Sequence, residues 1–159
     1  MRKSTQPTTI LVIEAENAKG VLARILVTLD RPNYYVAALN MSKTDVNNQV
    51  IITIEAVIPE PESANLVLRL EKIIEVERAT ARSISSHHLL KAGVFKIDAG
   101  KATAKFWQTV QKYGATVTFA EDYLLVQKTG CDNDLQELYN HLDQEYLNTY
   151  QETILAGCE

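Results

Sequence analysis

Residues 10–39, ILVIEAENAKGVLARILVTLDRPNYYVAAL, decide how the first half of the chain folds. Thr9 to Ala15 is rich in β-branched and apolar residues, which is typical of a strand. The polar corner Glu16–Gly20 follows, and after it apolar residues recur at helical spacing. A proline ends this helix, and a second strand begins at Tyr34. The corner therefore frames the exposed N-terminus of a helix that packs against a sheet.

This corner could bind a small anion. The first N–H groups of a helix lack intrahelical partners and lie at the positive end of the helix dipole. The N–H groups of Gly20, Val21 and Leu22 could therefore hold the carboxylate of an amino acid, while the Asn17 amide bonds its ammonium or carboxylate. The alternative is a tight corner and a helix start that bind nothing, and the residues alone leave both readings open.

The rest of the first half completes a known element order. Two further strands, at residues 34–41 and 49–58, are joined by the turn at 44–48 and form a hairpin. Pro61 marks the first turn of a second helix, and a fourth strand is expected at 74–84. Strand, helix, hairpin, helix, strand is the split βαβ, or ferredoxin-like, arrangement.

The second half runs through the same order without repeating the sequence. Its helical stripes and short apolar runs predict the following elements: a strand at 89–99, a helix at 102–113, a hairpin from 117–119 and 123–128, a helix capped by Asp132 or Asp134, and a strand within 146–155. We therefore predict an α+β protein of two tandem ferredoxin-like βαββαβ domains, residues 1–84 and 85–159.

Apolar residues occur at both parities of the central strands. Ile10 to Ile13 and Val50 to Ile52 are examples. Two helices cover only one face of a four-stranded sheet, so the second face should be polar unless something else covers it. We therefore expect a homodimer, or packing by the chain's own second domain.

Composition excludes several classes of function. The formal net charge of −4 over 159 residues argues against a nucleic-acid or anionic-membrane binder. No apolar segment approaches the roughly 20 residues of a membrane helix, and a signal peptide is not expected. Two cysteines in a chain of this size predict reduced thiols and a cytoplasmic location. Residues 1–84 hold 10 basic and 10 acidic side chains, whereas residues 85–159 hold 6 and 10.

The motif Asn17–Arg24 (NAKGVLAR), after ILVIEAE, resembles the ACT domain of the acetohydroxyacid synthase (acetolactate synthase) small subunit. Thr44-Asp45 falls where that family has a Thr-Asp/Glu turn. The stretches FKIDAG (95–100) and YLLVQKTG (123–130) resemble its C-terminal domain. The resemblance spans nearly the whole chain and is strongest over residues 10–30.

The resemblance implies a non-catalytic regulatory subunit. Such a chain forms a homodimer through its ACT domains and binds valine or a related branched-chain amino acid in the interface. It activates the large catalytic subunit and confers feedback inhibition. Thiamine diphosphate, magnesium and FAD are expected in that catalytic partner only, with no cofactor on this chain. Carried over by residue, Asn17 matches the family's corner asparagine and Gly20 the glycine that lets the effector approach the backbone. The predicted effector site adds the N–H groups of Val21 and Leu22, and Tyr35 at the position that faces the effector across the dimer.

Two departures from the family pattern affect this expectation. Tyr35 stands where the family has an asparagine at the effector site across the dimer. The C-terminal residues 151–159 replace a basic, glycine-containing end. The alternative is a stand-alone ACT-type sensor with another partner and no valine response.

Other chemistry has little support in the sequence. His87-His88 is most simply a linker, and Cys131, His141 and Cys158 lack the compact spacing of a zinc site. Trp107 follows a core phenylalanine and should be partly exposed. We expect no catalytic residue and no metal site, since neither a nucleophile–base motif nor a glycine-rich phosphate loop is present.

Overall fold

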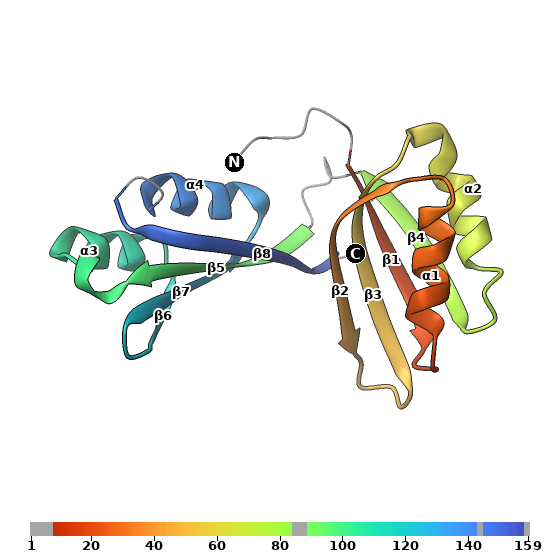
Figure 1. The fold of residues 1–159 in the computed structure, drawn as a ribbon, viewed down its shortest axis with the longest axis horizontal. Helices are drawn as coiled ribbons and strands as arrows, with labels where there is room; N and C mark the ends of the chain where they lie inside the picture. The colour runs from red at the N-terminus through yellow and green to blue at the C-terminus, as the bar shows by residue number, and fades with distance from the viewer. Residues whose placement is uncertain (1–7, 84–88, 143–144, 158–159) are drawn as a thin grey trace. The chain divides into compact units, whose positions relative to one another are not determined.

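The chain folds into two compact units, residues 1–87 and 88–159. The structure, a computed structural model, describes residues 8–83, 89–142 and 145–157. Each unit combines a four-stranded antiparallel sheet with two α-helices (Figure 1). The predicted α+β class, with a βαββαβ order that occurs twice, is confirmed.

The first unit follows the predicted order strand by strand. Its elements are β1 (Thr8–Glu16), α1 (Val21–Asp30), β2 (Tyr35–Lys43), β3 (Gln49–Val57), α2 (Glu60–Leu70) and β4 (Val76–Ser83). The strands lie in the order β2-β3-β1-β4, so β2 and β4 form the edges. Helices α1 and α2 lie side by side on one face of this sheet (Figure 1).

The core of the first unit lies between the sheet and these helices. Alternate residues of β1, namely Leu11, Ile13 and Ala15, are fully buried against Ile25 and Leu29 of α1. This is the period-2 face of a strand meeting the apolar stripe of a helix. The opposite parity is less uniform: on β1, Ile10 is buried whereas Val12 is partly exposed.

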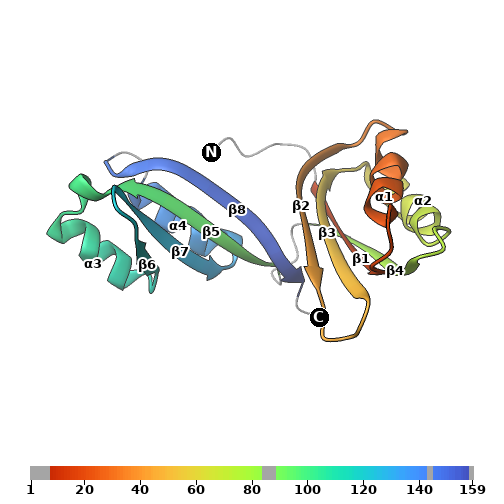
Figure 2. The same ribbon diagram turned by 60° about the horizontal axis from the view of Figure 1, so that its bottom comes forward.

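The second unit has the same topology. Its elements are β5 (Leu89–Asp98), the 3₁₀ turn η1 (Ala99–Lys101), α3 (Ala104–Lys112), β6 (Thr116–Phe119), β7 (Tyr123–Gly130), α4 (Asp132–Leu142) and β8 (Leu147–Gly157). The strands lie in the order β6-β7-β5-β8, with the short β6 and the long β8 at the edges (Figure 2). Phe95, Phe106 and Leu138 are fully buried at its centre.

A buried lysine distinguishes this second core. The ammonium of Lys91 on β5 lies 3.0 Å from Asp132 Oδ1 and 3.4 Å from Glu152 Oε1, and only 5% of its side chain is exposed. The Tyr150 hydroxyl donates to the second Glu152 oxygen at 2.7 Å. Burial, together with this hydrogen bond, raises the pKa of Tyr150 above its ordinary value, so the phenol stays a donor. The network joins β5, β8 and the first turn of α4.

Several predicted boundaries needed correction. The fourth strand begins at Val76 and not at residue 74, because Ile74 lies in the preceding turn and is 97% exposed. The helix expected at 102–113 is shorter, since Thr103 caps it by accepting the N–H of Phe106. Asp134 acts from inside the first turn of α4, where it accepts the N–H of Cys131 at 3.1 Å.

Candidate functional site

The corner between β1 and α1 depends on a glycine. Gly20 lies immediately before α1 with φ of +84°, in the left-handed region that other residues rarely adopt. A Cβ at this position would lie 3.2 Å from Nη1 of Arg24, whose guanidinium lies across the corner. The local backbone therefore requires glycine for conformation and for space.

The corner is held from both neighbouring strands. The N–H of Glu16 donates to the carbonyl of Glu75, and the N–H of Asn17 donates to the carbonyl of Asn48, both at 2.8 Å. Arg24 forms an ion pair with the Glu75 carboxylate, which links the first turn of α1 to the entry of β4. The corner is thus bound to the hairpin on one side and to β4 on the other.

The three backbone N–H groups predicted to bind a carboxylate differ in whether they already have a partner. The N–H of Val21 donates to the carbonyl of Ala18 at 3.3 Å, so it is already engaged. Within the part of the chain that the structure describes, the N–H groups of Gly20 and Leu22 have no partner. The side chain of Val21 is buried in the core, and that of Leu22 packs against it. These residues could therefore contribute backbone donors to a site, and their side chains support the helix.

Asn17 lies beside the hairpin. It lines a shallow cavity of about 400 Å³ with residues 43–49, the turn between β2 and β3. Thr44 orders this turn, because its hydroxyl accepts the N–H of Val46 at 3.2 Å. The Thr44-Asp45 turn that the sequence pattern singled out is therefore next to Asn17.

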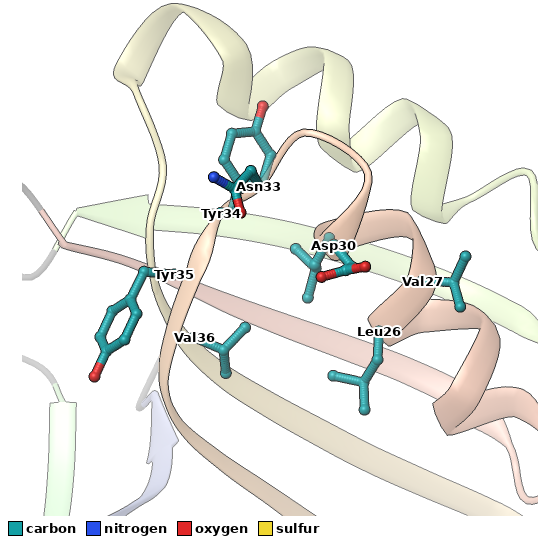
Figure 3. A pocket seen from close by; sticks show the side chains of 8 residues that line it. Leu26, Val27, Asp30, Asn33, Tyr34, Tyr35 and Val36 are labelled. Atoms are coloured by element: carbon teal, nitrogen blue, oxygen red, sulfur yellow. The ribbon is translucent and has the colours of Figure 1, made fainter.

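A larger cavity lies at the other end of α1. It has a volume of about 620 Å³ and lies between the second half of α1 and the start of β2; its lining residues are Leu26, Val27, Leu29, Asp30, Asn33, Tyr34, Tyr35 and Val36. Figure 3 shows that Val36 points toward α1, whereas Tyr35 points away on the other side of β2. Tyr35 is 69% exposed and pairs with Val57 in the sheet.

One copy of the chain does not bring the predicted effector residues together. Asn17, Gly20, Val21 and Leu22 lie at the N-terminal end of α1, and Tyr35 follows its C-terminal end. A helix of ten residues is about 15 Å long, which separates the two groups by more than the length of an amino acid. Tyr35 could join the corner only from a second copy.

The second cavity has residues that sequence reasoning missed. Leu26, Val27 and Val36 give it aliphatic walls, and the Asp30 carboxylate stands near the C-terminal end of α1. A carboxylate at the negative end of a helix dipole favours a cationic group such as an ammonium. Asn33, with φ of +61°, was a signal in the sequence, because asparagine after a proline often marks a left-handed turn.

Tyr34 fixes the entry of β2. Its hydroxyl donates to the Glu62 carboxylate on α2, and its N–H donates to the carbonyl of Leu29 at 3.3 Å. Burial raises the pKa of Tyr34, and the hydrogen bond to Glu62 raises it further. The phenol therefore remains a donor that ties β2 to the second helix.

The described residues contain no candidate metal site. Among them, no group of three or more His, Cys, Asp or Glu side chains is placed to hold a metal ion. His87, His88 and Cys158 lie outside the described residues. No helix in the described ranges has both the length and the apolar character needed to cross a membrane.

Comparison with known proteins defines the class of the first unit. Residues 17–79 match the family model of the ACT domain. This stretch runs from the corner asparagine into β4 and so covers most of the first unit, which is an ACT domain.

Comparison with solved structures finds proteins with a similar fold. The small subunit of acetolactate synthase from Thermotoga maritima superposes with a TM-score of 0.79 at 12% identity, over 92% of this chain and 93% of that one. The ligand-free regulatory subunit of aspartate kinase from Thermus thermophilus gives a TM-score of 0.48 at 14% identity, over 89% and 93%. No curated protein sequence matches the chain significantly.

Proposed function

We propose that this chain is the regulatory small subunit of a cytoplasmic acetolactate synthase and senses a branched-chain amino acid. The observation that carries the proposal is the Gly20 corner of an ACT domain, where the backbone N–H groups of Gly20 and Leu22 have no partner among the described residues. A carboxylate placed there would meet these donors and the positive end of α1. The chain itself performs no chemistry, and thiamine diphosphate, magnesium and FAD belong to the catalytic subunit.

The effector site needs two copies of the chain. The edge formed by α1 and β2 carries exposed apolar side chains, among them Val27, Leu39 and Met41. Exposed apolar groups beside an unpaired edge strand support association of two copies through this edge. Such a homodimer can place Tyr35 and the cavity near Asp30 of one copy beside the Gly20 corner of the other.

The proposed ligand follows from the chemistry of the two half-sites. The corner supplies donors for a carboxylate, and the cavity supplies Asp30 for an ammonium and aliphatic walls for a branched side chain. One methylene in such a pocket changes the binding free energy by about 1–3 kcal/mol, so valine, leucine and isoleucine should compete. Effector binding would favour one state of the complex and shift its population.

A stand-alone ACT sensor without a valine response is the second candidate. The exposed Tyr35 favours it, because this phenol stands where the resemblance places an effector-binding asparagine. A bulkier aromatic group at that position would change the size and polarity of the effector site.

Two measurements test the proposal. Isothermal titration calorimetry should show millimolar or tighter binding of valine, leucine or isoleucine, and Asn17→Ala should weaken it about tenfold by removing one hydrogen bond. Asn65→Ala, on the exposed face of α2, is the matched control and should bind as the wild type does. Absence of aliphatic amino-acid binding at millimolar concentration would rule out the effector assignment.

The partner is tested by activity. Addition of the chain to the catalytic subunit should raise acetolactate formation, and valine should lower it again. Binding of valine without any effect on that enzyme would favour the stand-alone sensor. Sedimentation that shows only a monomer at micromolar concentration would contradict the dimer.

A further inference from the structure

Two aromatic side chains of the second unit form an exposed stack. Trp107 on α3 and Phe119 on β6 have ring centroids 5.9 Å apart, with 25° between the ring planes. Phe119 is 70% exposed and Trp107 is 38% exposed. Neither ring lines the cavity beside Asn17 or the cavity beside Asp30.

The stack is anchored on the core of the second unit. Trp107 also meets Phe106 edge-on, with centroids 5.1 Å apart and 75° between the planes. Phe106 is fully buried, and its ring centroid lies 5.5 Å from that of Tyr146. A partner would therefore meet rings that are already oriented, which lowers the conformational entropy lost on binding. Tryptophan anchors of this kind are enriched at the energetic centres of protein interfaces.

The charged side chains beside the stack indicate which kind of partner could bind there. Glu121 and Asp122 in the β6–β7 turn are exposed and follow Phe119 after one residue, Ala120. Residues 85–159 as a whole hold 6 lysines and 10 acidic residues. Stacking of nucleic-acid bases requires a positive groove for the phosphates, and the acidic turn beside Phe119 argues against such a groove. A second copy across a twofold axis would bring the same acidic turn against itself, which is repulsive.

We infer that the Trp107–Phe119 stack is a docking surface for a protein whose facing patch offers an apolar pocket bordered by lysine or arginine. The inference rests on the proposed function in one respect, because it assigns this patch to the catalytic subunit. β6 is an edge strand, so the facing segment can also reach its unpaired backbone groups. The second unit would then hold the catalytic subunit while the ACT unit responds to the effector.

Trp107 is the only tryptophan of the chain, which gives the test a direct signal. The full-length chain is prepared with 5-fluorotryptophan, and its single fluorine resonance is followed while the unlabelled catalytic subunit is added. We expect the resonance to shift or broaden at stoichiometric ratio. The affinity should also fall as salt rises, because the acidic turn attracts the partner.

Variants separate docking from folding. Phe119→Ser, on a ring that is mostly exposed, should weaken binding to the catalytic subunit at least about tenfold, as expected for an interface anchor. Ile74→Ser removes another exposed apolar side chain, in the first unit, and should leave binding unchanged. A charge reversal at the turn, Glu121→Lys with Asp122→Lys, should weaken binding most at low salt.

The outcomes distinguish the two proposals. If the catalytic subunit is activated but the fluorine resonance stays in place and Phe119→Ser binds normally, the docking surface is wrong and the proposed function stands. If the catalytic subunit neither binds nor responds to the wild-type chain, both are wrong. Equal loss of binding in Phe119→Ser and Ile74→Ser would also overturn the assignment of the surface.

Discussion

Replacement of Gly20 by alanine should affect folding and effector binding together. With φ of +84°, an alanine there would adopt a left-handed conformation, which costs about 1–2 kcal/mol for an L-residue. Its Cβ would lie 3.2 Å from Arg24 Nη1, so the guanidinium that pairs with Glu75 must also move. We therefore expect Gly20→Ala to lower the free energy of unfolding by about 2 kcal/mol.

Gly114→Ala is a matched control for this strain. Gly114 follows α3 with φ of +60°, and a Cβ there would meet only the flexible end of Lys128, at 3.9 Å. It should cost about 1–2 kcal/mol as well, without any change at the corner. Urea denaturation followed by circular dichroism measures both losses, and calorimetry with valine measures the effector affinity.

The two variants should differ in ligand binding. Gly20→Ala should weaken the binding of valine by about tenfold or more, because a methyl group and a displaced Arg24 would crowd the N–H groups of the corner. Gly114→Ala should bind valine as the wild type does. If Gly20→Ala loses stability as expected but keeps the wild-type affinity, the effector does not bind at this corner.

Two further predictions concern the second unit. Lys91→Met should lower its free energy of unfolding by about 3 kcal/mol, because two carboxylates lose a buried cation. Lys105→Met removes an exposed ion pair at 3.6 Å and should cost less than about 0.5 kcal/mol. Denaturation followed by the fluorescence of Trp107 measures both losses of stability. Equal losses in the two variants would contradict the idea that burial makes the Lys91 pairs important. Hydrogen bonds from the thiol and N–H of Cys131 lower the pKa of Asp134, so its stabilisation is present above the ordinary carboxyl range and is lost as pH falls through the lowered pKa. Asp134→Ala should cost about 0.5–1 kcal/mol at pH 7 and almost nothing in strong acid, and a difference independent of pH in acid denaturation would exclude this role.

The sequence predicted elements well where one periodicity dominates. β1 and α1 were placed within a residue or two, since a β-branched run and a helical stripe leave few alternatives. The predicted start of the fourth strand was wrong at Ile74. This isoleucine lies in an exposed turn, but by its residue type alone it looks like a strand residue. Burial of that side chain depends on what packs against it, and the local sequence does not contain this information.

The candidate site divides in the same way. The glycine at the corner could be singled out from the motif, because only the backbone of glycine enters the left-handed region at little cost. The cavity near Asp30 could not be predicted from the sequence. Val27 and Val36 line it together only because β2 lies beside α1 in the folded chain. The separation of Tyr35 from the corner is likewise a consequence of the length of α1 and of the side to which the strand residue points.

The sequence by itself determined the fold class and the twofold repeat of its elements, because hydrophobic periodicity, turn residues and helix breakers act over a few neighbouring residues. Only the tertiary structure decided which groups meet: the ion pair of Arg24 with Glu75 at the corner, the ion network of Lys91 and the exposed stack of Trp107 and Phe119. These contacts join residues that are distant in the chain. Their existence follows from strand register and helix packing, which a single sequence does not specify.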